Sequence, residues 1–236
     1  MSKITYKSDN RIRTVAAVAV FCALAYVACV VFHFRASFLT FDLKDAVMTI
    51  GAMLFGPVYG LAMVLVVALI EMVTISSTGL YGFIMNVLAS VSFVCVASLI
   101  YTRRRTMTGA LVGTVCAIFS MTAVMMLANL VITPFYMGAT AADVAKMIPT
   151  LLLPFNLTKA VFNAALVFIL YKPISAALRR AGFTSVSTTA GSSVAHTPEK
   201  AKGVGLTVIV AAVVAAAALV FFFLVLHGSV SFGSFG

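Results

Sequence analysis

The sequence is poor in the residues on which most enzymes rely. It has no tryptophan, three histidines and six acidic residues among 236. It also lacks the H-E-x-x-H, G-x-S-x-G and phosphate-loop motifs, and no two carboxylates stand at helical spacing inside an apolar run. These absences argue against an enzyme. They also exclude ATP hydrolysis by the usual loop, so transport against a gradient would need energy from a partner or an ion.

Charged residues are scarce, at 9% of the chain, whereas 63% of the residues are hydrophobic. Together with a mean hydropathy of +1.15, this composition is typical of an integral membrane protein. The net charge of +10 would suggest nucleic-acid binding in a soluble protein, but here lysine and arginine gather at the ends of apolar runs. We therefore expect a lipid bilayer, and no nucleic acid, as the partner.

Cysteine offers no metal or disulfide framework. All four cysteines lie in apolar runs without C-x-x-C spacing: Cys22, Cys29, Cys95 and Cys116. We expect them to be packing residues, with no metal site and no cofactor.

Apolar runs divide the chain into spans, given that a helix needs about 20 residues to cross the hydrocarbon core. The expected spans are residues 14–34, 45–55, 58–75, 82–101, 109–132, 149–171 and 206–227. The second is short and either enters from the interface or begins earlier, at Phe41. Gly56-Pro57 after it predicts a tight turn. The predicted fold class is an all-α integral membrane protein with six transmembrane helices and a C-terminal seventh.

Residues 182–204 are rich in Ser, Thr, Gly and Ala, which predicts a flexible cytoplasmic linker. It would separate a six-helix substrate-binding domain, residues 1–181, from an extra C-terminal transmembrane helix, residues 205–236. That last helix is apolar throughout, so we expect it to pack against lipid at the periphery.

Basic residues set the orientation, because cytoplasmic loops are enriched in Lys and Arg. With the N-terminus inside, the basic clusters in residues 3–13, 103–105 and 172–202 face the cytoplasm. Only Arg35, Lys44 and Lys146 then lie outside. We predict a multi-pass protein of the cell membrane with a cytoplasmic N-terminus.

A single cation, Lys159, lies inside the sixth span. A lysine near mid-span costs about 2.5 to 3.5 kcal/mol on insertion scales, and such a charge usually lines a cavity and meets a partner or ligand. Asn156 lies one turn earlier on the same face. We interpret this helix as one wall of a binding site for a polar molecule.

Two acidic patches each allow two interpretations. Glu71, near the outer end of the third span, either snorkels to water or faces a cavity. Thr40, Asp42 and Asp45 lie in an outer segment whose polar and apolar residues alternate. That segment is either an extended flap against a ligand or an ordinary solvated loop with an Asp near a helix N-terminus.

Amide side chains within the spans are the remaining polar signal: Asn86, Asn129, Asn156 and Asn163. Each needs a partner on a neighbouring helix or on a ligand rich in carbonyl and hydroxyl groups. Pro134 and Tyr136 predict a helix break and an aromatic side chain at an outer helix end, apt for stacking on a flat ring.

The first span has small residues at Ala16, Ala19 and Ala23. This spacing permits close approach of another helix, either inside the protein or on another membrane subunit.

Several short motifs follow one another along the chain: Leu39-Thr-Phe-Asp-Leu-Lys-Asp45, Phe55-Gly-Pro-Val-Tyr-Gly60, Ser77-Thr-Gly79, Gly82-x-x-x-Asn86-x-x-Ala-Ser90, Asn129 with Pro134-x-Tyr136, and Pro154-Phe-Asn156-x-x-Lys159. In this order they resemble the substrate-binding S components of energy-coupling factor (ECF) vitamin transporters, most closely the riboflavin-specific branch. The resemblance covers approximately residues 12–180.

The resemblance implies a six-helix protein that captures riboflavin near its outer face for ATP-driven uptake. A transmembrane coupling subunit and two cytoplasmic ATPases would be its partners, and the alanines of the first span would match the docking surface. It places Asn129, Asn156 and Lys159 on flavin-site positions, with further candidates at Thr40, Asp42 and Asn86. Tyr136 and Glu71 complete the candidate site for the reasons given above.

Other functions stay open. The chain would be an S component for another vitamin or precursor, or a secondary transporter that uses an ion gradient without ATPases. A retinal protein with an intramembrane lysine is a further alternative, but the lysine lies in the sixth span and no tryptophan exists to enclose a retinal.

Overall fold

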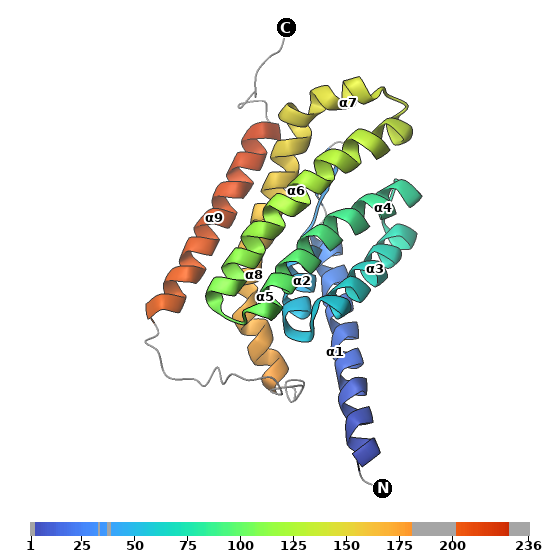
Figure 1. Cartoon of the computed structure of the whole chain (residues 1–236). Helices are drawn as coiled ribbons and strands as arrows, with labels where there is room; N and C mark the ends of the chain where they lie inside the picture. The colour runs from blue at the N-terminus through green and yellow to red at the C-terminus, as the bar shows by residue number, and fades with distance from the viewer. Residues whose placement is uncertain (1–2, 33, 37–38, 181–201, 227–236) are drawn as a thin grey trace.

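The computed structural model describes residues 3–32, 34–36, 39–180 and 202–226. These residues form a bundle of long helices and one short β-hairpin (Figure 1). The helices are α1 (Lys3–Val31), α2 (Lys44–Phe55), α3 (Pro57–Thr74), α4 (Gly79–Ser90), α5 (Val96–Arg103), α6 (Met107–Met137), α7 (Ala141–Met147), α8 (Leu153–Arg180) and α9 (Lys202–Leu226). The short π-helical segments η1 (Val91–Cys95) and η2 (Ile148–Leu152) join α4 to α5 and α7 to α8.

Five helical stretches of the described residues are long and apolar enough to cross a bilayer: Arg11–Val31, Pro57–Thr74, Gly79–Arg103, Met107–Met137 and Ala141–Ala177. A helical membrane protein is therefore confirmed. α2 has 12 residues, which is too short to span a bilayer alone, and it begins at Lys44, not at Phe41. Within α9 the apolar stretch found is Val208–Ala218. The count of six spans plus a seventh thus stays a prediction.

The chain is mostly helical, and between α1 and α2 it forms one short β-hairpin. There β1 (Phe34–Ala36) pairs antiparallel with β2 (Leu39–Phe41). Side chains alternate between the two faces of a strand, and in β2 Leu39 and Phe41 are buried while Thr40 is not. The extended flap that the alternation suggested is therefore present, and it leads directly into α2.

α2 is the helix around which the bundle packs, since every residue from Lys44 to Met53 is buried. Gly56 follows it at φ 111° and Pro57 opens α3, so the predicted tight turn is confirmed. Proline suits this first helical position because its missing N–H would have no partner there. A Cβ on Gly60 would lie 2.6 Å from the Cβ of Ala52, which shows how closely α2 and α3 approach.

The main apolar core surrounds α2 with buried side chains from α1, α3, η1 and α6, such as Phe21, Met63, Phe93 and Met121. Large apolar side chains also cover the outside of the bundle. Phe119 and Val131 on α6 are 68% and 62% exposed. Apolar surface on both sides of a helix is what a bilayer selects, because lipid replaces water as the surrounding medium.

α6 runs without interruption to Met137, with Pro134 inside it. The predicted helix break at this proline is therefore wrong. A proline removes one backbone hydrogen bond, and so close to the end of a helix of 31 residues that loss does not stop the last turn.

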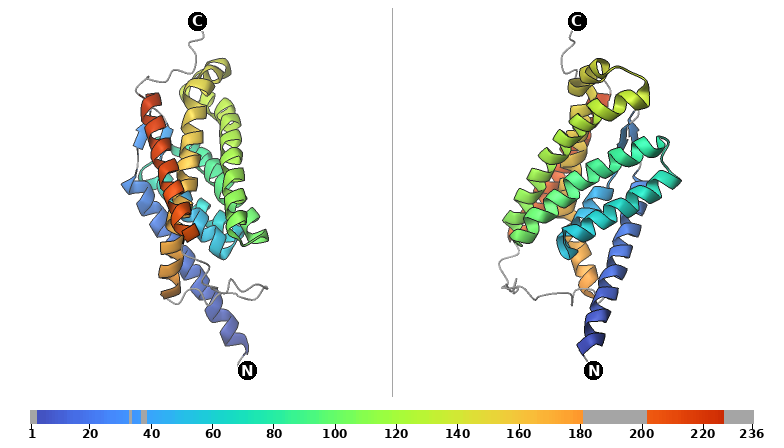
Figure 2. Two further views of the ribbon diagram at one scale, coloured as in Figure 1. Left: turned by 90° about the vertical axis from the view of Figure 1, so that its left-hand side faces the viewer. Right: turned by 45° about the vertical axis from the view of Figure 1, so that its right-hand side comes forward.

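α9 lies alongside α8 on the outside of the bundle, as two views show (Figures 1 and 2). Ala211, Ala215 and Ala218 are its buried residues, and they belong to a second apolar cluster with Phe41, Phe162 and Ala165. Of the predicted linker, residues 182–201 lie outside the described residues, and Lys202 already begins α9.

Candidate functional site

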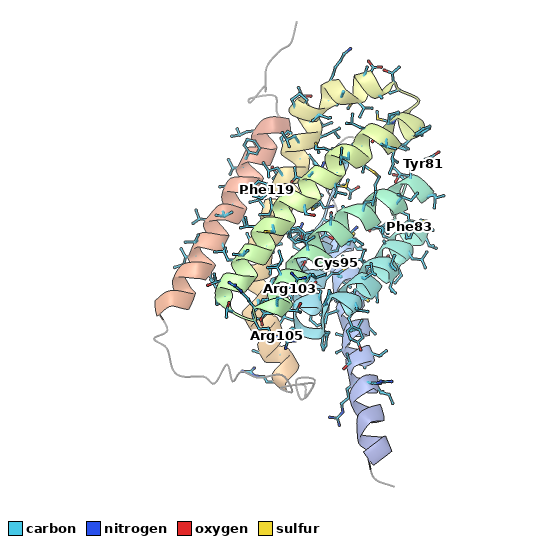
Figure 3. The ribbon with its side chains drawn as sticks, viewed as in Figure 1. Tyr81, Phe83, Cys95, Arg103, Arg105 and Phe119 are labelled. Atoms are coloured by element: carbon cyan, nitrogen blue, oxygen red, sulfur yellow. The ribbon has the colours of Figure 1, made fainter. Side chains whose placement is uncertain are left out.

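A pocket lies between α4, α6, α8 and strand β2. Its wall is largely apolar, with Leu39, Met85, Met121, Met125 and Phe155 among the lining residues. Tyr81 also lines it. This residue lies near the start of α4, at the end of the continuous segment α4–η1–α5 that is opposite Arg103 and Arg105 (Figure 3). A mostly apolar cavity with a few polar groups is typical of a small-molecule site.

Six of the predicted site residues line this pocket: Thr40, Asn86, Asn129, Tyr136, Asn156 and Lys159. They come from β2, α4, α6 and α8, which are distant in the sequence. The other two, Asp42 and Glu71, are not lining residues. They lie behind the wall, 0% and 3% exposed.

Lys159 is not a free cation. Its Nζ donates to Asp42 Oδ2 at 2.8 Å and to the carbonyl oxygen of Thr40 at 3.1 Å, so the expectation that this lysine meets a partner is confirmed. An ammonium group has three donors, and these two contacts leave one N–H for a ligand. The pocket wall therefore presents a donor whose charge is already neutralised.

Lys44, placed outside by the loop charges, is buried, with 1% of the residue exposed. Its Nζ donates to Glu71 Oε2 and lies 3.5 Å from Asp42 Oδ2. Burial also rules out the solvated alternatives for Asp42 and Glu71. The outer side given to Lys44 by the loop charges stays a prediction, but a loop count of charges could not show that the protein encloses this residue.

Glu71 joins α3 to the pocket through Asn86. The amide nitrogen Nδ2 of Asn86 donates to Glu71 Oε1 at 2.9 Å, while the other carboxylate oxygen of Glu71 accepts from Lys44. Both oxygens of a buried carboxylate are thus engaged, which offsets the cost of removing this charge from water.

Asn163 fixes the start of α2 from a distance of more than 100 residues in the chain. Its Oδ1 accepts from the backbone N–H of Ala46 at 2.9 Å, and its Nδ2 donates to the carbonyl oxygen of Asp42 at 3.1 Å. The first N–H groups of a helix have no partner within it, and no side chain at Leu43 caps α2. Asn163 therefore acts as the cap and holds the Asp42 backbone beside α8.

Asn129 and Asn156 keep hydrogen-bonding capacity for a ligand. Asn156 Nδ2 donates to the carbonyl of Leu152 at 2.8 Å, and Asn129 Nδ2 donates to that of Met125 at 2.7 Å. Asn129 Oδ1 also accepts from Thr133 Oγ1 at 2.9 Å, so these bonds all stay within one helix, whereas Asn86 and Asn163 bond to other elements as expected. An amide has two N–H donors and an acceptor oxygen, so both side chains retain polar atoms for the pocket.

The sequence reasoning missed Tyr81 and the methionines that line the pocket. Helical spacing was the available signal, because Met121 and Met125 precede Asn129 at intervals of four and share its face. In the same way, Met85 adjoins Asn86 on the pocket side of α4. The ring centroids of Tyr81 and Tyr136 lie 6.4 Å apart, and the ring planes are tilted by 50°. α4 and α6 therefore each contribute one aromatic side chain to the same part of the pocket wall.

The geometry disfavours a metal at the buried charges. Ligand atoms of Cys29, Asp42 and Glu71 lie within 4.8 Å of one another. However, the ammonium groups of Lys44 and Lys159 already bind the two carboxylates, and their positive charge would repel a cation. These residues are better described as an ion-pair network.

The small residues of α1 lie on its exposed face. Ala16, Ala19 and Ala23 are all exposed, whereas Ala17 and Ala25 on another face of the helix are buried in the bundle. The stripe therefore takes no part in the internal packing of the bundle.

Comparisons with known proteins agree on one family. Residues 13–171 match the family described as ECF transporter, substrate-specific component. The chain is 27% identical over 187 residues to the riboflavin transporter RibU of Staphylococcus aureus (strain TCH60), covering 75% of this chain and 97% of that protein. It is also similar to the solved structure of the S component of a bacterial ECF transporter, with a TM-score of 0.62 and 25% identity. That match covers 72% of this chain and 99% of the solved chain, and α9 lies beyond the residues of the family match.

Proposed function

Because this chain belongs to the substrate-specific components of ECF transporters, we propose that it captures riboflavin in the pocket between α4, α6, α8 and β2. The family is one of transport proteins, so the chain is a substrate-binding subunit and not an enzyme. A relative that is similar over 75% of this chain is a riboflavin transporter.

The observation that carries the riboflavin proposal is the combination of groups on the pocket wall. Apolar and aromatic side chains such as Met85, Met125 and Phe155 suit a flat ring system. Asn129 and Asn156 offer donors and acceptors, and Lys159 offers an additional donor. A flavin has this division between a ring and carbonyl and hydroxyl groups.

We assign direct contacts to the six predicted residues that line the pocket: Thr40, Asn86, Asn129, Tyr136, Asn156 and Lys159. Asp42 and Glu71 act from behind the wall. Because Asp42 neutralises Lys159, the site favours a polar ligand without a net negative charge.

Uptake against a gradient needs partners, because the sequence has no phosphate loop. The proposed partners are a transmembrane coupling subunit, docked on the exposed alanines of α1, and two cytoplasmic ATPases. The protein would lie in the cell membrane with its N-terminus in the cytoplasm and the pocket open to the outside.

Titration of riboflavin fluorescence against the purified protein in detergent tests the proposal. We expect quenching that saturates at one flavin per chain and weakens about 10-fold or more, equivalent to about 1.4 kcal/mol, in Lys159→Ala or Asn156→Ala. Val131→Ala on the exposed face of α6 is the matched control and should bind like the wild type.

Absence of saturable quenching by folded protein would contradict riboflavin as the ligand. The same protein would then be tested with other vitamins, because the family assignment does not depend on the flavin. Uptake that requires an ion gradient but no ATPase would favour the secondary transporter instead.

A further inference from the structure

The buried charges form one continuous chain of contacts between two walls of the pocket. On α8, Lys159 donates to Asp42 Oδ2 at 2.8 Å. The same oxygen lies 3.5 Å from the Nζ of Lys44, which donates to Glu71 Oε2. The other oxygen of Glu71 accepts from the amide of Asn86 on α4 at 2.9 Å. We call these five residues the relay. Its two ends, Lys159 and Asn86, line the pocket, whereas Asp42, Lys44 and Glu71 in the middle do not.

The middle of the relay has no access to a ligand. Asp42, Lys44 and Glu71 are 0%, 1% and 3% exposed, so they influence a bound molecule only through Lys159 and Asn86. Electrostatic interactions are strong in such an interior, and members of a hydrogen-bonded network polarise one another. A change at Glu71 is therefore transmitted to the pocket wall.

On the basis of the proposed riboflavin site, we propose that Glu71 and Lys44 are positioning residues for the ligand. Glu71 holds the amide nitrogen of Asn86, and this turns the amide oxygen of Asn86 away from Glu71. Lys44 holds the carboxylates of Glu71 and Asp42 at a fixed separation, and Asp42 in turn holds the ammonium group of Lys159. The ion pair of Lys44 and Glu71 thus fixes the positions of the Lys159 ammonium group and the Asn86 amide in the pocket wall without touching the ligand.

A pair that only binds α2 to α3 would affect folding but not the pocket. Two substitutions at Glu71 separate these roles. Glu71→Ala removes the acceptor for Asn86, whereas Glu71→Gln keeps an oxygen that accepts from it. Val64→Ala is the matched control, because Val64 is on the same helix, is 0% exposed and has an aliphatic side chain that cannot hydrogen-bond to the relay.

The experiment is riboflavin titration together with thermal unfolding of the full chain in detergent. We expect Glu71→Ala and Asn86→Ala each to weaken riboflavin binding about 10-fold, and the double variant to lose less than the product of the two single losses, because Asn86 carries one of the two routes from Glu71 to the ligand. Such non-additivity identifies residues that act through one another. Glu71→Gln should recover most of the affinity, and Val64→Ala should lower the unfolding temperature without changing affinity.

The inference is overturned if Glu71→Ala unfolds at a lower temperature but binds riboflavin like the wild type. It is also overturned if the losses of Glu71→Ala and Asn86→Ala multiply in the double variant. Should Glu71→Ala not fold, Glu71→Asp serves instead, since its shorter side chain keeps the charge but cannot span both contacts. It should weaken binding about threefold or more in the wild-type background and by a smaller factor in Asn86→Ala, and unchanged affinity in the wild-type background rejects the inference. Failure of the wild type to bind riboflavin would instead contradict the proposed function itself.

Discussion

Lys44 carries its charge inside the bundle, where Glu71 and Asp42 surround its ammonium group. Removing one partner of a buried ion pair leaves the other charge uncompensated and costs about 3 to 5 kcal/mol, whereas replacing both charges by neutral groups of similar volume is often far milder. The stability of the protein therefore depends on the balance of this pair more than on either charge alone.

We expect Lys44→Met to lower the free energy of unfolding by about 3 to 5 kcal/mol, because Glu71 then keeps a buried charge with no cation beside it. The double variant Lys44→Met/Glu71→Gln should regain a large part of that loss. Chemical unfolding in detergent measures both. Lys146→Met, at a lysine whose side chain is 80% exposed, should have no effect, and equal losses in the single and double variants would contradict the expectation.

Single residues were predictable where the residue type was rare in its surroundings. Lys159 and the asparagines stand out in apolar spans, and the structure gathers Asn129, Asn156 and Lys159 at one pocket. The burial of Lys44 was not predicted, because it depends on Glu71, a residue 27 positions away. No local pattern reports a partner at that distance.

At the scale of helices and strands, hydropathy predicted the long spans well, because the bilayer fixes their length. It also located α2, since the predicted run 45–55 matches Lys44–Phe55, but it could not show that protein surrounds this short helix. The hairpin of β1 and β2 was visible only as an alternating pattern in a few residues. Tertiary packing, more than local sequence, stabilises α2 and the hairpin.

α9 presents alanines to α8, and a larger side chain there should separate the two helices. We expect Ala215→Leu to lower the free energy of unfolding by about 1 to 3 kcal/mol, since Ala215 is 7% exposed and overpacking forces neighbours to move. Ala212→Leu, at an exposed position of the same helix, is the control. Riboflavin affinity should be unchanged in both, because none of the α9 side chains that the structure describes lines the pocket.

If Ala215→Leu is fully folded but binds riboflavin more weakly, the expectation that α9 affects stability and not affinity is contradicted. Such a result would show that α9 supports the site through α8. Thermal unfolding and flavin titration on the same samples distinguish the two outcomes.

For the whole molecule, the ends of the bundle differ in charge. Arg103, Arg104 and Arg105 lie where α5 turns into α6, and the turn from α6 to α7 lies at the opposite end (Figure 1). The excess of basic residues marks the cytoplasmic side. The pocket, with Tyr81 at the end away from Arg103 (Figure 3), would then open to the outside.

Cysteine labelling tests this orientation. The four native cysteines are replaced by alanine, and a single cysteine is introduced as Thr140→Cys or Arg104→Cys, both exposed positions. In intact cells a membrane-impermeant maleimide should react with the cysteine at position 140 and not with that at 104, which should react only after permeabilisation. The reverse pattern would invert the topology and contradict an outward-facing pocket.

The contact between Asp42 and Lys159 joins residues 117 positions apart, and this separation matters while the chain is being made. A ribosome that has released α2 into the translocon has not yet synthesised the lysine that neutralises Asp42, nor Asn163, which caps α2. Until α8 follows, the carboxylate of Asp42 lacks the ammonium group of Lys159 in an apolar environment. α2 is also too short to span the bilayer by itself. A chain that stops before α8 would therefore expose uncompensated carboxylates to membrane proteases. Synthesis of α8, the last of the four elements around the pocket, would remove this defect.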